Sequence, residues 1–357
     1  MLVFVQRDLG IGFGHTPKQT MASVRKCRGH SSFKEFFMIS AKPFKTVDEQ
    51  INILKSRKMS FPHVKFARKV LSFENYYYVV NGYKDPFINS TVPDDAYKPG
   101  VTFDELVALY SFDRKLREFL LIELLRIEHA VKAQIIITFS KYHGQDHNSY
   151  LCPASFNTSG SKNLQRANQL ISDLTQLIQE KHHKHGAIRH YVNKYGFVPL
   201  WVLSKVMTFG KLNSFYACML AKEKEEVANS FYLSAADFKS MIDFIADLRN
   251  KCAHGERIYC HSKDQRVPRP IPDTPHHKTL TIPKNRKGYK YGKCDILALL
   301  IAMKYFLHPD RFDKLVYHID YALNKKLKKR LRSIPCSDIQ KIMGLLGNWQ
   351  DIGKRVP

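Results

Sequence analysis

The chain has 357 residues, 44% of them hydrophobic, which is enough for a large buried core. Its 57 lysines and arginines against 32 aspartates and glutamates leave a formal charge of +25, so a polyanion is the expected partner, nucleic acid before a membrane surface. No apolar run approaches the roughly 18 to 20 residues of a membrane-spanning helix, and the seven cysteines are scattered singly, which disfavours disulfide and zinc frameworks. We therefore expect a protein of the reducing cytoplasm that does not enter a membrane.

Residues 1–40 mix glycine, histidine, lysine and serine without clear periodicity. This composition predicts a flexible basic arm, unless translation starts at Met21 or Met38. A first helix is expected to begin at about Thr46, where apolar residues start to recur every three or four positions.

An aromatic-rich segment from Phe61 to Tyr78 is expected to form the second helix. The run Tyr76–Val80 at its end could equally be a short strand, because aromatic and β-branched residues also favour strands. We expect these tyrosines to pack in the core, with stacking on nucleic-acid bases as the less favoured alternative.

Thr102 and Glu105 have the spacing of a capping box, and the apolar pattern after them predicts one long helix, or two abutting ones, to about Tyr142. Glu128 lies in this region and is most simply a helix-surface residue. If this helix packs against the helix that follows Ser234, however, Glu128 could orient a catalytic His or Arg, since carboxylates often fix such groups.

Two shorter features follow in the chain. The apolar spacing over residues 164–178 predicts an amphipathic helix that ends near Gly186, and the run KHHKHG at 181–186 is read as a solvated helix end. A metal site there is disfavoured because the histidines have no acidic or cysteine neighbours. Pro199 suits the first position of the next helix.

The strongest pattern is the stretch DFIADLRNKCAHGERIY, from Asp243 to Tyr259. Its apolar residues recur at helical spacing, and Ser234 is the expected N-cap of this helix. The polar end carries four candidate residues: Arg249, Asn250, His254 and Arg257. Histidine can act as acid or base near neutral pH, and a guanidinium binds phosphate oxygens, so the set suits metal-free cleavage of RNA.

Spacing alone leaves a simpler reading of this stretch open. Arg followed by His after four to six intervening residues occurs five times in the chain. The helix could merely end at Gly255 with solvated basic residues around it, and His254 would then lie near the negative end of the helix dipole.

The stretch from Cys260 to Lys293 is the longest irregular one and is rich in proline and basic residues. It could grip an RNA backbone or be a disordered insertion that contacts nothing, and both readings stay open. Asp295 to Leu307 has the pattern of a buried helix, and residues 324–332 hold six positive charges without an acid, which favours a phosphate-facing helix or tail. The predicted RNA-binding residues are Arg266, Arg269, Lys284, Arg286, Lys287, Lys325, Lys326, Lys328, Lys329 and Arg330.

The sequence R-N-x-x-A-H, followed by G-E-R-I-Y, resembles the R-x(4–6)-H motif of HEPN-domain ribonucleases, in the form found in abortive-infection proteins of the Abi-like, AbiD/AbiF type. Three other segments match that family in the same order, namely residues 42–61, 112–135 and 190–216. The resemblance covers about residues 41–307 and implies a mostly α, HEPN-type helical bundle with helical extensions. In this division an arm over 1–40 precedes the domain, the basic loop 260–293 lies within it, and a basic helical extension spans 308–357.

The resemblance also implies an activity. The protein is expected to be a metal-independent endoribonuclease of abortive infection and phage defence, without metal or cofactor, that leaves 2′,3′-cyclic phosphate and 5′-hydroxyl ends. His254 would be the general acid or base, Arg249 the phosphate clamp and Asn250 the residue that positions the site, with Arg257 and Glu128 as auxiliary groups. Control by an antitoxin, a small RNA or a phage trigger is implied as well. The alternative is a non-catalytic HEPN module that holds a structured RNA or a partner protein.

On a regular helix the side chains of Arg249 and His254 point about 140° apart. Either the helix ends before His254, or two chains complete one site between them. HEPN ribonucleases are similar in building a composite site from two motif copies, so we predict a homodimer.

Overall fold

The computed structural model describes residues 43–91, 94–261 and 270–353. Contacts divide the chain into two units, residues 1–46 and residues 47–357, and every element named below lies in the second. The described residues are mostly α-helical, with two two-stranded sheets, which confirms the predicted mostly α class. The predicted arm over residues 1–40 lies outside the described residues, as do Arg266 and Arg269.

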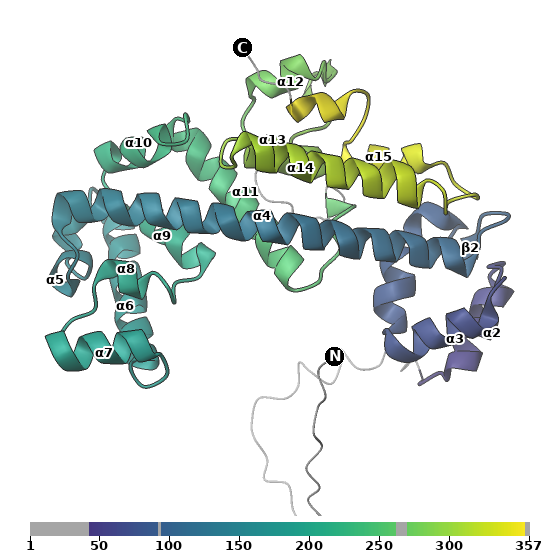
Figure 1. Cartoon of the computed structure of the whole chain (residues 1–357), viewed down its shortest axis with the longest axis horizontal. Helices are drawn as coiled ribbons and strands as arrows, with labels where there is room; N and C mark the ends of the chain where they lie inside the picture. The colour runs from purple at the N-terminus through teal and green to yellow at the C-terminus, as the bar shows by residue number, and fades with distance from the viewer. Residues whose placement is uncertain (1–42, 92–93, 262–269, 354–357) are drawn as a thin grey trace, which may run out of the picture. The chain divides into compact units, whose positions relative to one another are not determined.

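The longest element is α4, which runs from Phe103 to His143 and crosses the width of Figure 1. Its first turn is closed by the predicted capping box, in which Thr102 Oγ1 accepts from the backbone N–H of Glu105 at 3.2 Å. In return, Glu105 Oε2 accepts from the Thr102 N–H at 3.1 Å. The predicted long helical region is thus one continuous helix. Elements that pack against it include η1 (Tyr77–Asn81), α8 (Leu200–Leu203), α9 (Phe209–Cys218), α10 (Ala221–Asn229), α11 (Ala235–Ala253), α14 (Pro309–Asp320) and η5 (Tyr321–Leu327).

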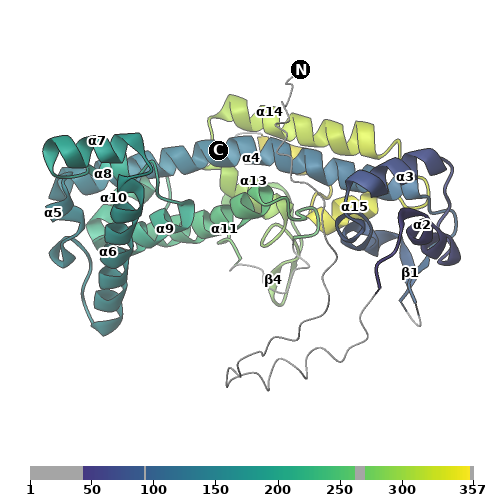
Figure 2. The same cartoon turned by 90° about the horizontal axis from the view of Figure 1, so that it is seen from below.

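Helices from both halves of the chain pack on α4. Figure 2 shows α14, from Pro309 to Asp320, and α11, from Ala235 to Ala253, on opposite sides of it. The buried helix predicted from Asp295 is α13, Ile296–Lys304, which packs against both. Asp295 caps it by accepting from the Ala298 N–H at 2.9 Å.

The remaining elements complete the unit. Before α4 lie α2 (Val47–Ser56), α3 (Val64–Phe73), η1 (Tyr77–Asn81), η2 (Asp85–Phe87), β1 (Ile88–Ser90) and β2 (Ala96–Tyr97). Between α4 and α11 lie α5 (His147–Tyr150), η3 (Pro153–Ser155), α6 (Ser161–His182), α7 (Gly186–Tyr195), α8 (Leu200–Leu203), α9 (Phe209–Cys218) and α10 (Ala221–Asn229). After α11 lie α12 (Pro275–Thr279), β3 (Lys284–Asn285), β4 (Gly288–Tyr289), α13, α14, η5 (Tyr321–Leu327), α15 (Cys336–Met343) and η6 (Trp349–Gly353).

Several local predictions can be compared with these bounds. The helices expected near Thr46, near Phe61 and over residues 164–178 are present as α2, α3 and α6. The run Tyr76–Val80 is not a strand, because η1 is a π-helical turn. Pro199 is the N-cap residue of α8 rather than its first helical residue, and α8 has only four residues.

The structure of residues 270–293 excludes one of the two interpretations of the irregular stretch. Ile271, Leu280 and Ile282 are buried, and α12 carries two buried histidines, His276 and His277. The ring Nε2 of His277 lies 2.8 Å from the backbone oxygen of Gly292. The disordered-insertion reading is therefore wrong for residues 270–293, because this segment has its own apolar side chains to bury.

Among residues 43–91, 94–261 and 270–353, none of the helices combines the length and the apolar character that crossing a bilayer requires. The same ranges hold no group of three or more His, Cys, Asp or Glu side chains placed to bind a metal ion.

Candidate active site

The candidate site begins where α11 ends. The helix runs to Ala253 and His254 is its C-cap residue, so the first of the two geometric alternatives holds and the helix stops just before the histidine. Gly255 follows with φ +72°, a left-handed conformation that glycine adopts without steric cost. The Gly255 N–H donates to the Cys252 oxygen at 3.3 Å and the Glu256 N–H to the Lys251 oxygen at 2.9 Å, the two hydrogen bonds of a Schellman motif. The predicted stop at Gly255 is confirmed.

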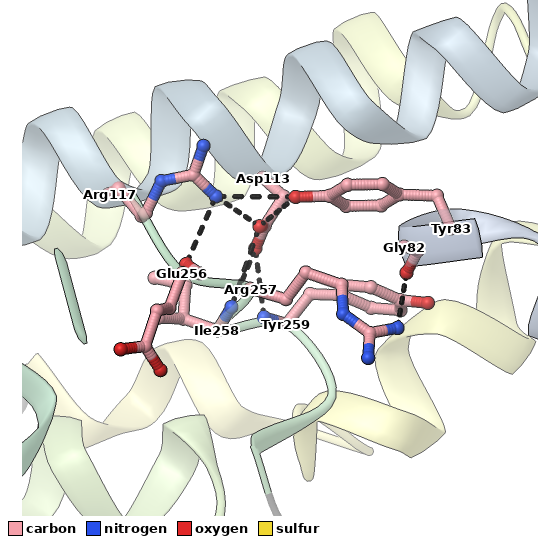
Figure 3. A network of polar contacts seen from close by, with 8 residues as sticks. All are labelled: Gly82, Tyr83, Asp113, Arg117, Glu256, Arg257, Ile258 and Tyr259. Carbon is pink, nitrogen blue, oxygen red and sulfur yellow. Dashed lines mark hydrogen bonds and ion pairs between the residues drawn. The ribbon is translucent and has the colours of Figure 1, made fainter. Parts of the chain in front are cut away.

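Past Gly255, the segment 256–259 is held against α4 by one carboxylate. Asp113 of α4 is completely buried and accepts from the backbone N–H groups of Ile258, at 3.3 Å, and Tyr259, at 2.8 Å (Figure 3). A buried backbone N–H without a partner costs free energy. Asp113 supplies the hydrogen-bond acceptors that a neighbouring strand would otherwise provide. It thereby fixes the chain just after the motif.

Two side chains complete this buried network. The Tyr83 hydroxyl donates to Asp113 Oδ2 at 2.6 Å, and Arg117, one turn further along α4, forms an ion pair with the same oxygen (Figure 3). Arg117 Nη1 also donates to the Glu256 carbonyl at 3.3 Å. Burial raises the pKa of Asp113, while the Arg117 guanidinium, the Tyr83 hydroxyl and the two backbone N–H groups act in the opposite direction. The Asp113 carboxylate in turn raises the pKa of Arg117, against the effect of burial.

The side chain of Arg257 extends from this segment toward η1. Its guanidinium donates to the Gly82 carbonyl and lies 3.9 Å from an Asp85 oxygen, yet 40% of the side chain stays exposed (Figure 3). One face of the predicted auxiliary arginine is therefore used to hold η1, and the remaining donors face solvent.

Arg249 is held by a different set of residues. Its Nε lies 2.9 Å from Oε2 of Glu128, and the other oxygen of Glu128 lies 3.7 Å from Lys132 Nζ. Lys132 also donates to the Met207 carbonyl at 3.2 Å, and burial lowers the pKa of its amine. Glu128 is only 5% exposed, so the reading of it as a solvated surface residue is wrong. Because α4 packs on α11, the Glu128 carboxylate lies beside a motif residue, and that residue is Arg249 rather than His254.

Asn250 extends this arrangement, because its Oδ1 accepts from Arg249 Nη1 at 3.1 Å. The guanidinium thus forms an ion pair with the Glu128 carboxylate on its Nε side and donates a hydrogen bond from Nη1 to the Asn250 amide oxygen. An arginine fixed in this way loses little conformational entropy when it binds an anion through its remaining N–H groups. The pair is suited to clamp a phosphate.

His254 is exposed and lines a groove of about 1110 Å³ between α4, η1 and the segment after α11. Arg257, Arg114, Tyr77 and Tyr78 are among the residues that line it. Tyr77 and Tyr78 are each 67% exposed, so the expectation that they pack in the core is wrong for both. In the π-helical turn only Val79 and Val80 are buried, which leaves the two tyrosine rings on the groove side.

The charges in the groove are largely balanced. Arg114 forms an ion pair with Glu74 at 3.3 Å, and Tyr110 donates to the other oxygen of Glu74 at 2.8 Å. Within the part of the chain that the structure describes, the groove lining does not include Arg249 or Asn250. Both residues belong to α11, the helix whose C-cap residue is His254. Although the helix ends before His254, one chain therefore does not bring the predicted base and the predicted clamp into the same groove.

A comparison with protein families decides where the chain belongs. A family model described as "Abi-like protein" matches residues 69–260, which is 192 of the 357 residues. The chain belongs to the Abi-like protein family. This membership implies a part in abortive infection, that is, in defence against phage. Comparisons with curated proteins and with solved structures found no match.

The matched range of this Abi-like protein contains the motif and also Asp113, Arg117 and Tyr83, which the sequence analysis did not single out. A signal for two of them was present, because Asp113 and Arg117 are opposite charges four residues apart inside an otherwise apolar helix face. Nothing in the pattern indicated Tyr83, whose place in the network depends on how η1 packs against α4.

The predicted RNA-binding residues fall in two places. Lys284, Arg286 and Lys287 are exposed at the β3–β4 hairpin, where Lys284 Nζ lies 4.2 Å from the centre of the Tyr289 ring. The other five, Lys325, Lys326, Lys328, Lys329 and Arg330, are exposed in and just after η5. None of these eight lines the groove that contains His254.

Proposed function

We propose that this Abi-like protein is a metal-independent endoribonuclease that acts in phage defence and cuts RNA to 2′,3′-cyclic phosphate and 5′-hydroxyl ends. The observation that carries the proposal is the position of His254. It is the exposed C-cap residue of α11, it opens into a groove lined by exposed aromatic rings, and the chain after it is anchored by Asp113.

The reaction needs a base to take the proton of the 2′-hydroxyl, an acid to protonate the leaving 5′-oxygen, and positive charge beside the phosphate. Histidine fits either proton-transfer role, because an imidazole can accept or donate a proton at physiological pH. We assign the phosphate clamp to Arg249, positioned by Asn250 and Glu128, and an auxiliary phosphate contact to the exposed face of Arg257.

A homodimer is part of the proposal. Because Arg249 does not line the groove of its own chain, a second copy is the simplest source of the missing groups. Two His254 side chains facing one another would supply the base and the acid, each from one chain. Leu125, 39% exposed and one turn before Glu128 on α4, is the residue at which we would place a charge to disrupt the dimer. A Leu125→Asp variant that is monomeric and fully active would refute the composite site.

The experiment incubates purified wild type, His254→Ala and His308→Ala with total RNA in excess EDTA, followed by analysis of the fragment ends. His308 is a matched control, since its side chain is 73% exposed and lies at the N-cap of α14 rather than in the groove. Cleavage by wild type and His308→Ala alone, with cyclic-phosphate ends, would support the proposal. Cleavage that is abolished by EDTA, or that persists in His254→Ala, would overturn it.

A different outcome would favour the non-catalytic alternative. If wild type and His254→Ala bind RNA equally tightly and neither cuts it, the protein is better described as a HEPN module that holds RNA or awaits a trigger. Expression of the same pair in growing cells separates these cases, because only an enzyme released from control makes toxicity depend on His254.

A further inference from the structure

A second surface lies at the junction of α14 and η5, and we call it the lysine–tyrosine surface. It surrounds a hollow of about 380 Å³. The residues that line the hollow are Tyr317, Asp320, Tyr321, Lys325, Lys326 and Lys329. None of them belongs to the lining of the groove with His254.

Two tyrosines form the aromatic part of this surface. Tyr317 is 63% exposed and Tyr321 is 42% exposed, although large aromatic rings are usually buried. Their ring centres lie 6.2 Å apart with an angle of 22° between the planes, so the rings are nearly parallel and offset. The Nζ of Lys326 lies 5.4 Å from the centre of the Tyr321 ring. This arrangement presents flat faces to a ligand beside a positive charge.

The surface carries an excess of positive charge, because three lysines line the hollow with one aspartate. Lys325, Lys326 and Lys329 form no ion pair with any carboxylate of the described residues. Asp320 is the only acidic residue of the hollow's lining, and its Oδ1 accepts from Asn324 at 2.7 Å and from Gln350 at 2.8 Å. Its hydrogen bonds are thus made with neutral amides. An external polyanion is the group that would neutralise these lysines.

The backbone beneath the surface is a hydrogen-bonded π-helical turn that packs on its neighbours. The segment η5 is a π-helix of seven residues, in which the Lys328 N–H donates to the Leu323 oxygen at 3.0 Å. Leu323 and Leu327 are buried, and Asn324 accepts from Gln340 of α15 at 3.0 Å. π-Helical turns are rare and occur frequently at functional sites. Here the turn directs its apolar residues inward and leaves its lysines on the outside.

We infer that the lysine–tyrosine surface is an additional binding site for single-stranded RNA. Unpaired bases stack on Tyr317 and Tyr321, while Lys325, Lys326 and Lys329 contact the phosphates. The bases of a duplex already stack on one another and cannot reach the rings, so the site selects single strands. The inference rests on the proposed function for the identity of the ligand as RNA, but binding itself requires no cleavage.

The test measures binding of a fluorescein-labelled single-stranded RNA of about 20 nucleotides by fluorescence anisotropy, in EDTA. All proteins carry His254→Ala, so that the probe stays intact. Tyr317→Ala and Tyr321→Ala are each expected to weaken binding at least about fivefold, the loss typical of one stacked base. Tyr317→Phe keeps the ring and should bind normally, whereas Tyr317→Leu keeps only an apolar side chain and should bind as the alanine variant does.

Tyr232→Ala is the matched control, because Tyr232 is 93% exposed and lies after α10, away from the lysine–tyrosine surface. It should bind as the parent protein does. Unchanged binding in both Tyr317→Ala and Tyr321→Ala, or equal losses in Tyr317→Leu and Tyr317→Phe, would overturn the inference.

The lysines are tested through salt dependence. Each phosphate contact on a single strand contributes about −0.7 to the slope of log binding constant against log salt concentration. Lys325→Gln combined with Lys326→Gln should therefore make the slope less steep by about 1.4, and an unchanged slope would contradict the assignment. A duplex of the same sequence should bind more weakly and should not respond to Tyr317→Ala. A DNA strand that binds much more tightly than the RNA would overturn the choice of RNA.

The outcomes separate this inference from the proposed function. If the protein never cuts RNA but loses binding on Tyr317→Ala, the endoribonuclease proposal fails and the binding site stands. If wild type cuts RNA and the variants at Tyr317 and Tyr321 keep the same KM and kcat, the site fails and the nuclease stands. A raised KM with kcat unchanged is the result expected when both are right.

Discussion

Replacement of Asp113 by asparagine tests the buried network that holds the chain after His254. Asparagine has the same size, and its Oδ1 can still accept from the N–H groups of Ile258 and Tyr259. What it removes is the negative charge beside Arg117, whose side chain is only 10% exposed. An unpaired buried charge typically costs about 3 to 5 kcal/mol, so we expect Asp113→Asn to lower the free energy of unfolding by about that amount.

The assay is urea denaturation, in which a stability change moves the midpoint while the slope stays constant. The double variant Asp113→Asn/Arg117→Met decides whether the charge is the cause. Methionine fills similar space without charge, and replacing both members of a buried pair is often nearly neutral. The double variant should therefore recover most of the loss, giving a coupling energy of several kcal/mol in the double-mutant cycle.

Glu118→Gln is the comparison for this experiment. Glu118 pairs with Lys115 at 2.7 Å on the same helix, but both side chains are more than half exposed, and exposed pairs contribute at most about 1 kcal/mol. A loss below about 1 kcal/mol for Asp113→Asn, equal to that of Glu118→Gln, would refute the reasoning. So would a double variant that is no more stable than Asp113→Asn.

Three further predictions follow from the site and its surroundings. Glu128→Gln removes the charge that holds Arg249, and kcat/KM for RNA cleavage should fall about tenfold or more as the clamp loses its position. Burial lowers the pKa of His276 to about 4, so the unfolded chain takes up a proton there first as the pH falls below 6.5. The contribution of His276 to the free energy of unfolding is then fully present above pH 6.5 and is lost as the pH falls toward 4. The loss is about 2 kcal/mol between pH 7.5 and 5. Urea denaturation of His276→Asn should therefore show a weaker dependence of stability on pH. Gly255→Ala places a side chain at φ +72° in otherwise open space and should lower stability by about 1 kcal/mol in urea denaturation.

Two of these predictions have a control variant, and the third has an outcome that would contradict it. Glu118→Gln removes a carboxylate from the same helix and should leave cleavage unchanged, whereas equal effects of both variants would contradict the role of Glu128. For Gly255, the control is Gly210→Ala in α9, where φ is ordinary and nothing lies within 4 Å of the new methyl group. That variant should be neutral or slightly stabilised. If His276→Asn leaves the loss of stability between pH 7.5 and 5 unchanged, another group is responsible for it.

Local signals in the sequence were sufficient for several helices and for two of their ends. Thr102 and Glu105 specify the start of α4, and Gly255 specifies the end of α11, because capping depends on residues within one turn of each other. The apolar spacing likewise indicated α2, α6 and α13. The motif residues were recognisable for the same reason, since they lie in one continuous stretch, and the family was recognisable from that stretch together with three other segments in the expected order.

Other features depended on side chains brought together from distant positions. Only the packing of α4 against α11 places Glu128 beside Arg249, and only the packing of η1 places Tyr83 beside Asp113. The π-helical turns that expose Tyr77 and Tyr321 were not visible in the periodicity either. Periodicity predicts which face of an element is buried when the element is regular, but burial itself is decided by what the rest of the chain places against it.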